Sequence, residues 1–248
     1  MPLPPLGYAT DWTVRTFEID TAKRMTVPAL VQAMQEAAMQ NVLRIRLSVW
    51  DLEPHRISWV LMKFKLDLYR LPSLGESLRI RTYPAGFEKF FTYRDYLVED
   101  NQGQLLARAS SQWLLMDTDT RRMTRIPAWI LALEESMTNR ADWLERPDRR
   151  LVDVEEASNT RTYKVDYFDL DFNGHLNNLL YFRWMLETLP AERLTEGRLQ
   201  RMEVHFRAEA KWNEVLGSTV QAVDERTYAH RLARDGQALA TGLTTFAE

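Results

Sequence analysis

The chain has 248 residues, of which 45% are hydrophobic, with 32 lysines and arginines against 35 aspartates and glutamates. This length allows one large domain or two small ones, and a net charge of -3 lacks the basic field typical of proteins that bind nucleic acids or anionic membranes. Because the sequence contains no cysteine, disulfides, thiolate metal sites and a cysteine nucleophile are excluded. The N-terminal residues lack the charged start and apolar core of a signal peptide, and no apolar run reaches the ~18 residues needed to cross a bilayer, which together favour the cytoplasm.

The first half of the sequence predicts a strand, a helix and then an antiparallel meander. Apolar and polar residues alternate over 12–19 as they do in a strand, and Thr26 fits the N-cap of a helix over 27–43, whose first turn tolerates Pro28. From Ser58 onward the pattern is that of strands separated by turn residues, followed by a short helix. The predicted strands cover residues 59–69, 77–83, 90–98 and 104–116, and the short helix covers 127–133.

The second half repeats this order of elements. A strand is predicted over 160–165 and a helix over 178–189, which Pro190 ends. Further strands are predicted over 201–210, 219–224, 227–234 and 238–246. Two short sequence matches support a tandem repeat: Leu74–Ser77 with Leu216–Thr219, and Gly103–Ala107 with Gly236–Ala240. We therefore predict domains over 1–135 and 158–248, joined by a linker over 136–157 that crosses the surface, because it carries a charge run and little apolar periodicity.

The helix predicted in the second half is apolar almost all round. A helix with no polar stripe must be enclosed on most sides. A sheet that curls around the helix satisfies both patterns, so the predicted fold class is α+β. This arrangement resembles the hotdog fold in its tandem, or double-hotdog, form, in which each unit is an antiparallel sheet wrapped around a central helix.

A dense group of polar residues precedes this apolar helix. Between Asp169 and Asn178 the sequence holds two acids, three asparagines, one histidine and one glycine. Gly174 allows a positive φ, and N–H groups at the start of the helix, on Gly174, Leu176 and Asn177, can bind developing negative charge. A thioester carbonyl attacked by water becomes an oxyanion, so the segment suits such a reaction. The alternative is structural: an asparagine caps the helix, the acids favour its dipole and the histidine is a satisfied polar residue.

Two segments resemble the motifs of one enzyme family. The segment from Asp169 to Glu187 looks like the active-site segment of acyl-acyl-carrier-protein thioesterases, which are known from plant plastids and from bacteria. The segment from Phe206 to Leu216 is similar to the second motif of that family. The resemblance covers nearly the whole chain and implies hydrolysis of fatty acyl-acyl-carrier-protein to free fatty acid and carrier protein.

The resemblance also implies which residues act. It places the active-site residues of the first motif on Asp171, Asn173 and His175, and the acid of the second motif on Glu209. Ala210 occupies the position of a cysteine in the family, which excludes covalent catalysis from that position and favours attack by water. We expect Glu209 to come from a strand and to activate the water, directly or together with His175. Asn173 would hold the water or the carbonyl, and Asp171 would hold or polarise the other groups.

The remaining histidines are interpreted differently. His205 shares a predicted strand face with Arg207 and Glu209, because alternate residues of a strand point the same way, and we interpret it as part of a polar strand face. His55 and His230 have no second histidine at a metal-ligand spacing, and no phosphate-binding loop is found. Neither a metal nor a cofactor is therefore predicted.

The first unit has no counterpart of the polar segment, because its matching residues, 20–28, contain neither histidine nor asparagine. In the family, the N-terminal hotdog supplies the acyl pocket and the C-terminal one supplies the chemistry. By that resemblance, the candidate pocket residues are Met25, Met34, Met39, Trp59, Leu61 and Met62. Methionine and aromatic residues also fill ordinary cores, which is the alternative for each of them.

The partner that the resemblance implies is an acidic acyl carrier protein bearing a phosphopantetheine-linked fatty acyl chain. Residues that can form a basic rim for it, each otherwise an ordinary surface charge, are Arg149, Arg150, Arg161, Lys164 and Lys211. Neither nucleic acid nor a membrane span is expected, and the protein is expected to be a monomer or a homodimer.

Three other functions fit parts of the pattern. The polar segment also resembles that of small single-hotdog thioesterases acting on acyl-coenzyme A, although the tandem architecture favours the carrier protein. A hotdog dehydratase pairs a histidine with an acid placed differently. A non-catalytic acyl-thioester-binding protein would keep the fold without the reaction, and the full set of polar residues argues against it. The preferred chain length and saturation of the acyl group do not follow from the sequence.

Overall fold

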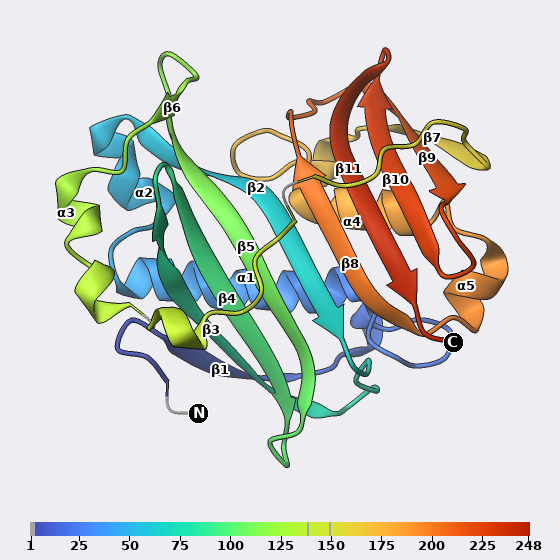
Figure 1. The fold of residues 1–248 in the computed structure, drawn as a ribbon, viewed down its shortest axis with the longest axis horizontal. Helices are drawn as coiled ribbons and strands as arrows, with labels where there is room; N and C mark the ends of the chain where they lie inside the picture. Colours follow the sequence, from blue (N-terminus) through green and yellow to red (C-terminus); the bar gives the residue numbers. More distant parts are fainter. Residues whose placement is uncertain (1–2, 138, 149) are drawn as a thin grey trace. The chain divides into compact units, whose positions relative to one another are not determined.

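The computed structural model describes residues 3–137, 139–148 and 150–248 (Figure 1). The chain forms two compact units: the first comprises Met1–Phe64 and Tyr69–Pro147, and the second comprises Lys65–Leu68 and Asp148–Glu248. In each unit an antiparallel sheet lies across a central helix, so the fold is α+β and of the tandem hotdog type (Figure 1). In the described residues, no helix combines the length and the apolarity that crossing a membrane requires.

The first unit is built around one long helix. Its strands are β1 (Tyr8–Thr13), β2 (Ile57–Leu68), β3 (Ser77–Glu88), β4 (Phe91–Asp100), β5 (Leu105–Asp117) and the short β6 (Met123–Thr124). The end of β2, Lys65–Leu68, belongs to the second unit. Its helices are α1 (Val27–Arg44), α2 (Val49–Leu52) and α3 (Ala128–Leu131), with 3-10 turns at Thr16–Glu18, Glu53–His55, Glu134–Ser136 and Arg140–Asp142. The strands lie in the order β1-β3-β4-β5-β2, and β6 pairs with β5.

Helix α1 forms because its sequence supplies a cap and an apolar face. The Thr26 hydroxyl accepts a hydrogen bond from the Ala29 N–H at 3.3 Å, and Pro28 lies in the first turn, where its missing N–H does no harm. The helix packs against β1 and β3, and the sheet passes across it in Figure 1. Its fully buried side chains include Leu30, Ala33, Met34 and Ala37. Burying a leucine or methionine side chain in this way stabilises the fold by about 1.5–3 kcal/mol.

The first strand, Tyr8–Thr13, begins and ends earlier than the predicted residues 12–19. Residues 14–19 do not continue β1, because Glu18 folds its side chain back and turns the backbone. The Glu18 carboxylate accepts the Arg15 N–H at 2.7 Å and the Trp12 indole N–H at 3.1 Å. A side chain that bonds to the backbone nearby competes with the sheet ladder and here ends the strand.

A polar network lies inside the first unit, between α1 and the sheet. The Arg94 guanidinium donates from Nη1 to Asn41 Oδ1 at 2.8 Å and to Thr82 Oγ1 at 3.1 Å, and Asn41 Nδ2 donates to the Leu6 carbonyl at 3.1 Å. Burial lowers the pKa of Arg94. Because buried polar groups are costly without partners, these bonds tie α1, β3 and β4 into one arrangement.

The segment predicted as a surface linker is packed where it leaves the first unit. Trp143 and Leu144 cover the outer face of the sheet, and the buried Asp95 carboxylate accepts the Leu144 N–H at 3.0 Å. Asp95 also pairs with Arg146 at 3.0 Å, and the Arg146 guanidinium lies 4.2 Å from the centre of the Trp143 ring. Burial raises the pKa of Asp95, against the opposing effect of Arg146. Residues 143–147 are therefore an ordered part of this unit, while the domain boundaries at 135 and 157 stay predictions.

The second unit repeats the first with a shorter central helix. Its strands are β7 (Asn159–Lys164), β8 (Leu199–Phe206), β9 (Val215–Ala222), β10 (Thr227–Arg234) and β11 (Gln237–Phe246). Its helices are α4 (Asn178–Leu186) and α5 (Ala191–Thr195), with a 3-10 turn at Tyr167–Asp169. The strand order β7-β9-β10-β11-β8 matches that of the first unit, with β7 in the place of β1 and β8 in the place of β2. The tandem repeat is thus confirmed.

One of the two sequence matches is in the wrong register. The Val14 N–H donates to the Glu76 carbonyl at 3.0 Å, and the Val165 N–H donates to the Glu214 carbonyl at 2.9 Å, so Glu76 corresponds to Glu214. The counterpart of Gly75 is therefore Asn213 and not the glycine of the sequence match. Their φ angles, 78° and 67°, explain the error, because asparagine is one of the few other residues that tolerate this backbone conformation. The second match is correct, since both of its glycines lie in equivalent hairpins.

His230 is enclosed within the second unit. The side chain lies on β10 with no exposed surface, and its Nε2 is 2.9 Å from the Thr244 hydroxyl. Burial lowers the pKa of His230 to about 3, against a smaller opposing effect of the Met185 backbone. The folded unit therefore holds a neutral imidazole.

We expect the free energy of unfolding to fall as the pH drops from 6.5, the ordinary pKa of histidine, towards about 3. In this window the unfolded chain takes up a proton on His230 that the folded chain does not, which removes about 1.4 kcal/mol per pH unit. Urea denaturation at about pH 7 and about pH 5 should show a smaller loss for His230→Asn than for the parent. His55→Gln, at an exposed position, is the control, and an unaltered pH dependence of His230→Asn would contradict the assignment.

Candidate active site

Two loops of the second unit meet at the start of α4. We call residues 170–177 the histidine loop and residues 207–214 the glutamate loop. The Leu176 N–H donates to the Ala210 carbonyl at 2.8 Å, and His175 forms a β-bridge with Lys211. Asn177 then caps α4, with its Oδ1 accepting the Leu179 N–H at 3.0 Å. The two motifs of the sequence are thereby joined through their backbones.

Asp171 builds the histidine loop. Its Oδ1 accepts the N–H of Asn173 at 2.8 Å and the N–H of His175 at 3.2 Å. The Asp171 N–H donates to the His175 carbonyl at 2.7 Å, and the Gly174 N–H donates to the Asp171 carbonyl at 3.0 Å. Gly174 has a φ of 74°, which glycine adopts without strain. One oxygen of Asp171 is therefore committed to shaping the turn that presents Asn173 and His175.

The first unit contains the same turn without the same side chains. Asp20 Oδ1 accepts the N–H groups of Ala22 and Arg24, each at 2.9 Å, and the Asp20 N–H donates to the Arg24 carbonyl at 2.8 Å. Lys23, with a φ of 61°, stands in the place of Gly174. The aspartate is thus a feature of the repeated fold, and what distinguishes the second unit is the histidine that follows it.

His175 and Glu209 are brought into contact. His175 Nε2 lies 3.1 Å from Glu209 Oε2. The two side chains are 21% and 32% exposed, so the pair is partly buried and water can reach it. The corresponding residues of the first unit are Arg24 and Leu71, as the equivalent bridge between Arg24 and Ser73 shows. An imidazole in contact with a carboxylate can remove a proton from water, and the first unit has no such pair at its equivalent position.

The alternation predicted that Glu209 lies on a strand. This prediction is wrong, because β8 ends at Phe206, before Glu209. The N–H groups of Arg207 and Ala208 both donate to the Leu239 carbonyl, at 2.8 and 3.2 Å, which interrupts the regular ladder. The hydroxyl of Tyr181, on α4, donates to the Ala208 carbonyl at 3.2 Å. Tyr181 was not singled out from the sequence, where it is only one of the apolar residues of the helix, yet it holds the backbone next to Glu209.

His205 lies outside the site, on a polar strand face that it shares with Glu203 and that is buried. Its Nε2 lies 2.8 Å from Glu203 Oε1, and both side chains are buried. The same Glu203 oxygen accepts the Asp148 N–H at 2.6 Å. The face shared with Glu209 in the sequence pattern is lost at the end of β8. His205 and Glu203 therefore bind the start of the second unit to its own sheet.

The remaining members of the predicted site are placed as follows. Asn173 is exposed beside His175. The backbone N–H groups expected to bind an oxyanion are occupied: Gly174 donates to the Asp171 carbonyl, Leu176 to the Ala210 carbonyl and Asn177 to the Asp169 carbonyl. Their occupation follows from the turn and the junction of the loops, which use these donors to hold the backbone. The oxyanion therefore needs a different donor.

The candidate pocket residues of the first unit differ in burial. Met25 and Met34 are fully buried, Leu61 is nearly so, and Met39, Trp59 and Met62 are partly exposed. On β2, Leu61 and Met62 point to opposite faces because neighbouring strand residues alternate. Trp59 donates from its indole N–H to the Leu47 carbonyl at 2.9 Å. Burial alone does not separate pocket-lining residues from ordinary core, so the acyl pocket stays a prediction.

The described residues contain no cluster of three or more histidine, aspartate or glutamate side chains that could hold a metal. Four of the five candidate rim residues are exposed: Arg150, Arg161, Lys164 and Lys211. The fifth, Arg149, lies outside the described residues.

Family models identify both units. The model of the acyl-ACP thioesterase N-terminal domain matches residues 5–133, and that of the acyl-ACP thioesterase C-terminal domain matches residues 152–248. Together they cover most of the sequence, in the order that the two units follow. The chain belongs to the acyl-ACP thioesterase family.

Individual relatives agree with this assignment. An acyl-acyl-carrier-protein hydrolase, FATB2, of Cuphea viscosissima is 30% identical over 88% of this chain and 56% of its own length. Oleoyl-acyl carrier protein thioesterase 1 of Arabidopsis thaliana is 24% identical over 96% of this chain and 75% of its own length. The chain spans about half of the length of the Cuphea relatives, 56% and 54% in two cases.

Solved structures show the same fold. The 12:0-ACP thioesterase from Umbellularia californica superimposes with a TM-score of 0.90 at 21% identity, covering 100% of this chain and 99% of that protein. An acyl-ACP thioesterase from Bacteroides thetaiotaomicron gives a TM-score of 0.88 at 21% identity, with 98% of each chain covered.

We expect Asp171→Ala and Asp20→Ala to lower the free energy of unfolding by similar amounts, about 1–2 kcal/mol each, because each removes the acceptor of two backbone N–H groups. Urea denaturation of both variants checks this. If Asp171→Ala were as stable as the parent while Asp20→Ala was not, the carboxylate of Asp171 would not build its turn.

Proposed function

We propose that this chain hydrolyses the thioester of fatty acyl-acyl-carrier-protein, releasing a free fatty acid and the carrier protein. The observation that carries the proposal is the contact of 3.1 Å between His175 and Glu209, in a chain whose two halves match the two domains of the acyl-ACP thioesterase family. Relatives named for this reaction on carrier-bound palmitoyl and oleoyl groups support the substrate class.

The proposed reaction needs only water and the side chains of the two loops. The His175–Glu209 pair takes one proton from a water molecule, whose oxygen attacks the carbonyl carbon. Asn173, exposed beside His175, donates its amide N–H to the carbonyl oxygen as this becomes negative. The C–S bond then breaks, and the proton held by the pair passes to the leaving sulfur. Ala210 offers no nucleophile, so no acyl-enzyme forms at that position.

Asp171 acts in this proposal as a positioning residue, because its Oδ1 is occupied by the turn. We assign the chemistry to the second unit, and the acyl pocket to the first unit by the family resemblance. A cytoplasmic location, and a monomeric or dimeric state, stay predictions of the sequence.

The direct test is to incubate the purified protein with acyl carrier proteins bearing chains of graded length and to measure the fatty acids released. The same chains on coenzyme A provide the comparison, and faster hydrolysis of the carrier-bound form supports the proposal. Faster hydrolysis of acyl-coenzyme A would replace the carrier protein with coenzyme A as the substrate. No release from either would overturn the proposed reaction.

We expect Glu209→Gln and His175→Ala each to lower kcat by roughly 10²–10⁴-fold, which is the usual contribution of general acid–base catalysis. Glu187→Gln is the control, because Glu187 lies at the end of α4, where it pairs with Arg183 and not with the loops. Single-turnover release of fatty acid, with the melting temperature of each variant, separates lost chemistry from lost folding. Full activity in either variant would remove that residue from the proposed mechanism.

A further inference from the structure

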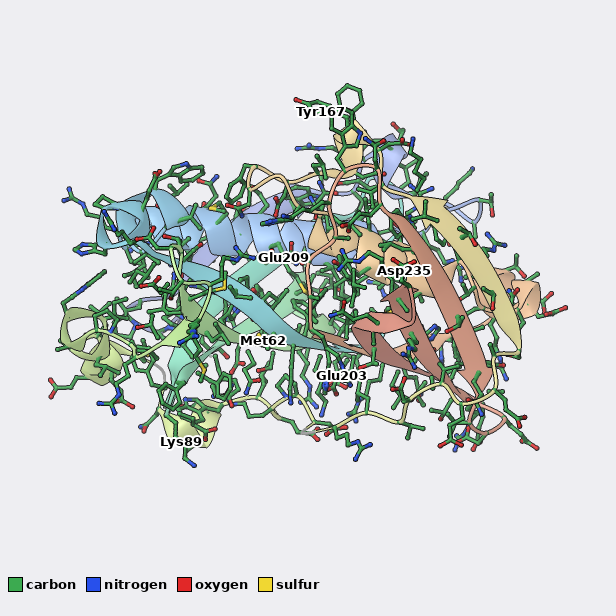
Figure 2. All side chains as sticks on the ribbon, turned by 90° about the horizontal axis from the view of Figure 1, so that it is seen from above. Met62, Lys89, Tyr167, Glu203, Glu209 and Asp235 are labelled. Carbon is green, nitrogen blue, oxygen red and sulfur yellow. The ribbon has the colours of Figure 1, made fainter. Side chains whose placement is uncertain are left out.

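Four large aromatic side chains stand exposed around the loops that carry His175 and Glu209: Phe172 and Trp212 on the two loops, and Tyr167 and Phe168 on the 3-10 turn just before the histidine loop. Tyr167 is 63% exposed, Phe168 96%, Phe172 60% and Trp212 54%. The Tyr167 ring packs edge-on against Phe168 and Trp212, with ring centres 5.5 and 5.7 Å apart. Figure 2 shows the Tyr167 side chain directed away from the ribbon at the outer end of its loop. We call these four residues the aromatic patch.

Hydrogen bonds hold the patch in place from both sides. Asp166 and Asp169 form a reciprocal capping box around the turn that carries Tyr167 and Phe168. On the glutamate loop, Glu214 Oε2 accepts the Lys211 N–H at 2.9 Å and a hydrogen bond from Arg234 at 2.6 Å, which fixes the turn that presents Trp212. The backbone that carries the rings is therefore held in place, so that less conformational entropy is lost when a partner covers them.

The repeated fold does not require these rings. The equivalent loops of the first unit carry Thr16, Phe17, Thr21 and Leu74 at the corresponding positions. Only Phe17 among them is aromatic, and the turns form equally well. Exposed aromatic clusters of this kind are typical of interaction surfaces and are otherwise unfavourable in water. Their concentration beside the His175–Glu209 pair needs an explanation outside the fold.

The charges around the patch select an acidic partner. Lys164 and Lys211 are exposed next to the patch and form no ion pair among the described residues. The carboxylates nearby already have partners: Asp166 and Asp169 accept backbone N–H groups of their own turn, and Glu214 pairs with Arg234. The outer surface thus offers aromatic rings flanked by lysines.

We propose that the aromatic patch is the surface on which the acidic body of the carrier protein docks while its arm delivers the thioester to His175 and Glu209. This inference rests on the proposed function, which supplies the carrier. The arm must end at the two loops, so the carrier body comes against their outer side, where the patch stands. Phe168, almost wholly exposed, reaches beyond the site itself, as a contact to a protein body requires.

The test measures KM and kcat of Trp212→Ala and Phe168→Ala on an acyl carrier protein and on acyl-coenzyme A with the same chain. Coenzyme A has the same phosphopantetheine arm but no protein body. We expect Trp212→Ala to raise KM for the acyl carrier protein about tenfold, which is the effect of removing a side chain that anchors an interface. The kcat for both substrates and the KM for acyl-coenzyme A should be unchanged. Phe168→Ala should also raise KM for the acyl carrier protein. Because the Phe168 side chain is almost wholly exposed, its removal should not impair folding. Phe17→Ala, the equivalent ring of the first unit, is the matched control.

Binding of the holo-carrier without an acyl chain, measured by calorimetry, separates this inference from the proposed function. A parent that hydrolyses nothing but binds the holo-carrier, with binding lost in Trp212→Ala, would overturn the reaction and support the docking surface. Equal rises in KM for both substrates would assign the patch to the arm, and unchanged values for both would leave it no role in docking; either overturns the inference. The inference would also be overturned if the parent bound anionic lipid vesicles, both variants lost this binding, and KM for the acyl carrier protein stayed the same.

Discussion

The hydrogen bond from the Leu176 N–H to the Ala210 carbonyl, at 2.8 Å, is the contact on which the candidate site depends. The apolar helix α4 has to lie inside its sheet, because it has no polar stripe to leave in water. The first turn of α4 directly follows the histidine loop, through which the chain enters the helix. The bond joins this entry to the glutamate loop and sets His175 opposite Glu209.

The two units show that this frame and the chemistry are separate properties. In the first unit the Met25 N–H donates to the Pro72 carbonyl at 2.8 Å, which is the equivalent junction. Arg24 and Leu71 then stand where the second unit has His175 and Glu209, so the same backbone carries no acid–base pair. The turn aspartate is kept in both, which is why its presence alone says little about catalysis. The fold supplies the geometry, and two side chains supply the reaction.

Patterns that depend on neighbours in sequence were predicted well. The N-cap at Thr26, the apolar α4 and the glycine hairpins after β4 and β10 depend on local periodicity and turn chemistry, and the tandem fold followed from them. The histidine loop was also recognised, because its polar residues are consecutive. Glu209 of the second motif was assigned by resemblance, and it lies against His175, but on a loop and not on the predicted strand.

The errors arise where contacts distant in sequence decide the structure. The end of β8 depends on two N–H groups that share the Leu239 carbonyl, and the occupied N–H groups of the histidine loop depend on the junction with Ala210. One sequence match was placed in the wrong register, because Asn213 takes the positive φ that Gly75 has in the first unit. The aromatic patch was not predicted, because Tyr167 and Trp212 are distant in sequence and only the fold brings their rings together.

If His175 and Glu209 act as one unit, a double-mutant cycle on kcat will show it. The rates of His175→Ala, Glu209→Gln and the double variant are compared under single-turnover conditions with a carrier-bound acyl chain. Residues that act together are strongly non-additive, so the double variant should be about as slow as the slower single variant. If the two losses multiplied in the double variant, His175 and Glu209 would contribute independently, and the contact between them would not be the basis of the reaction.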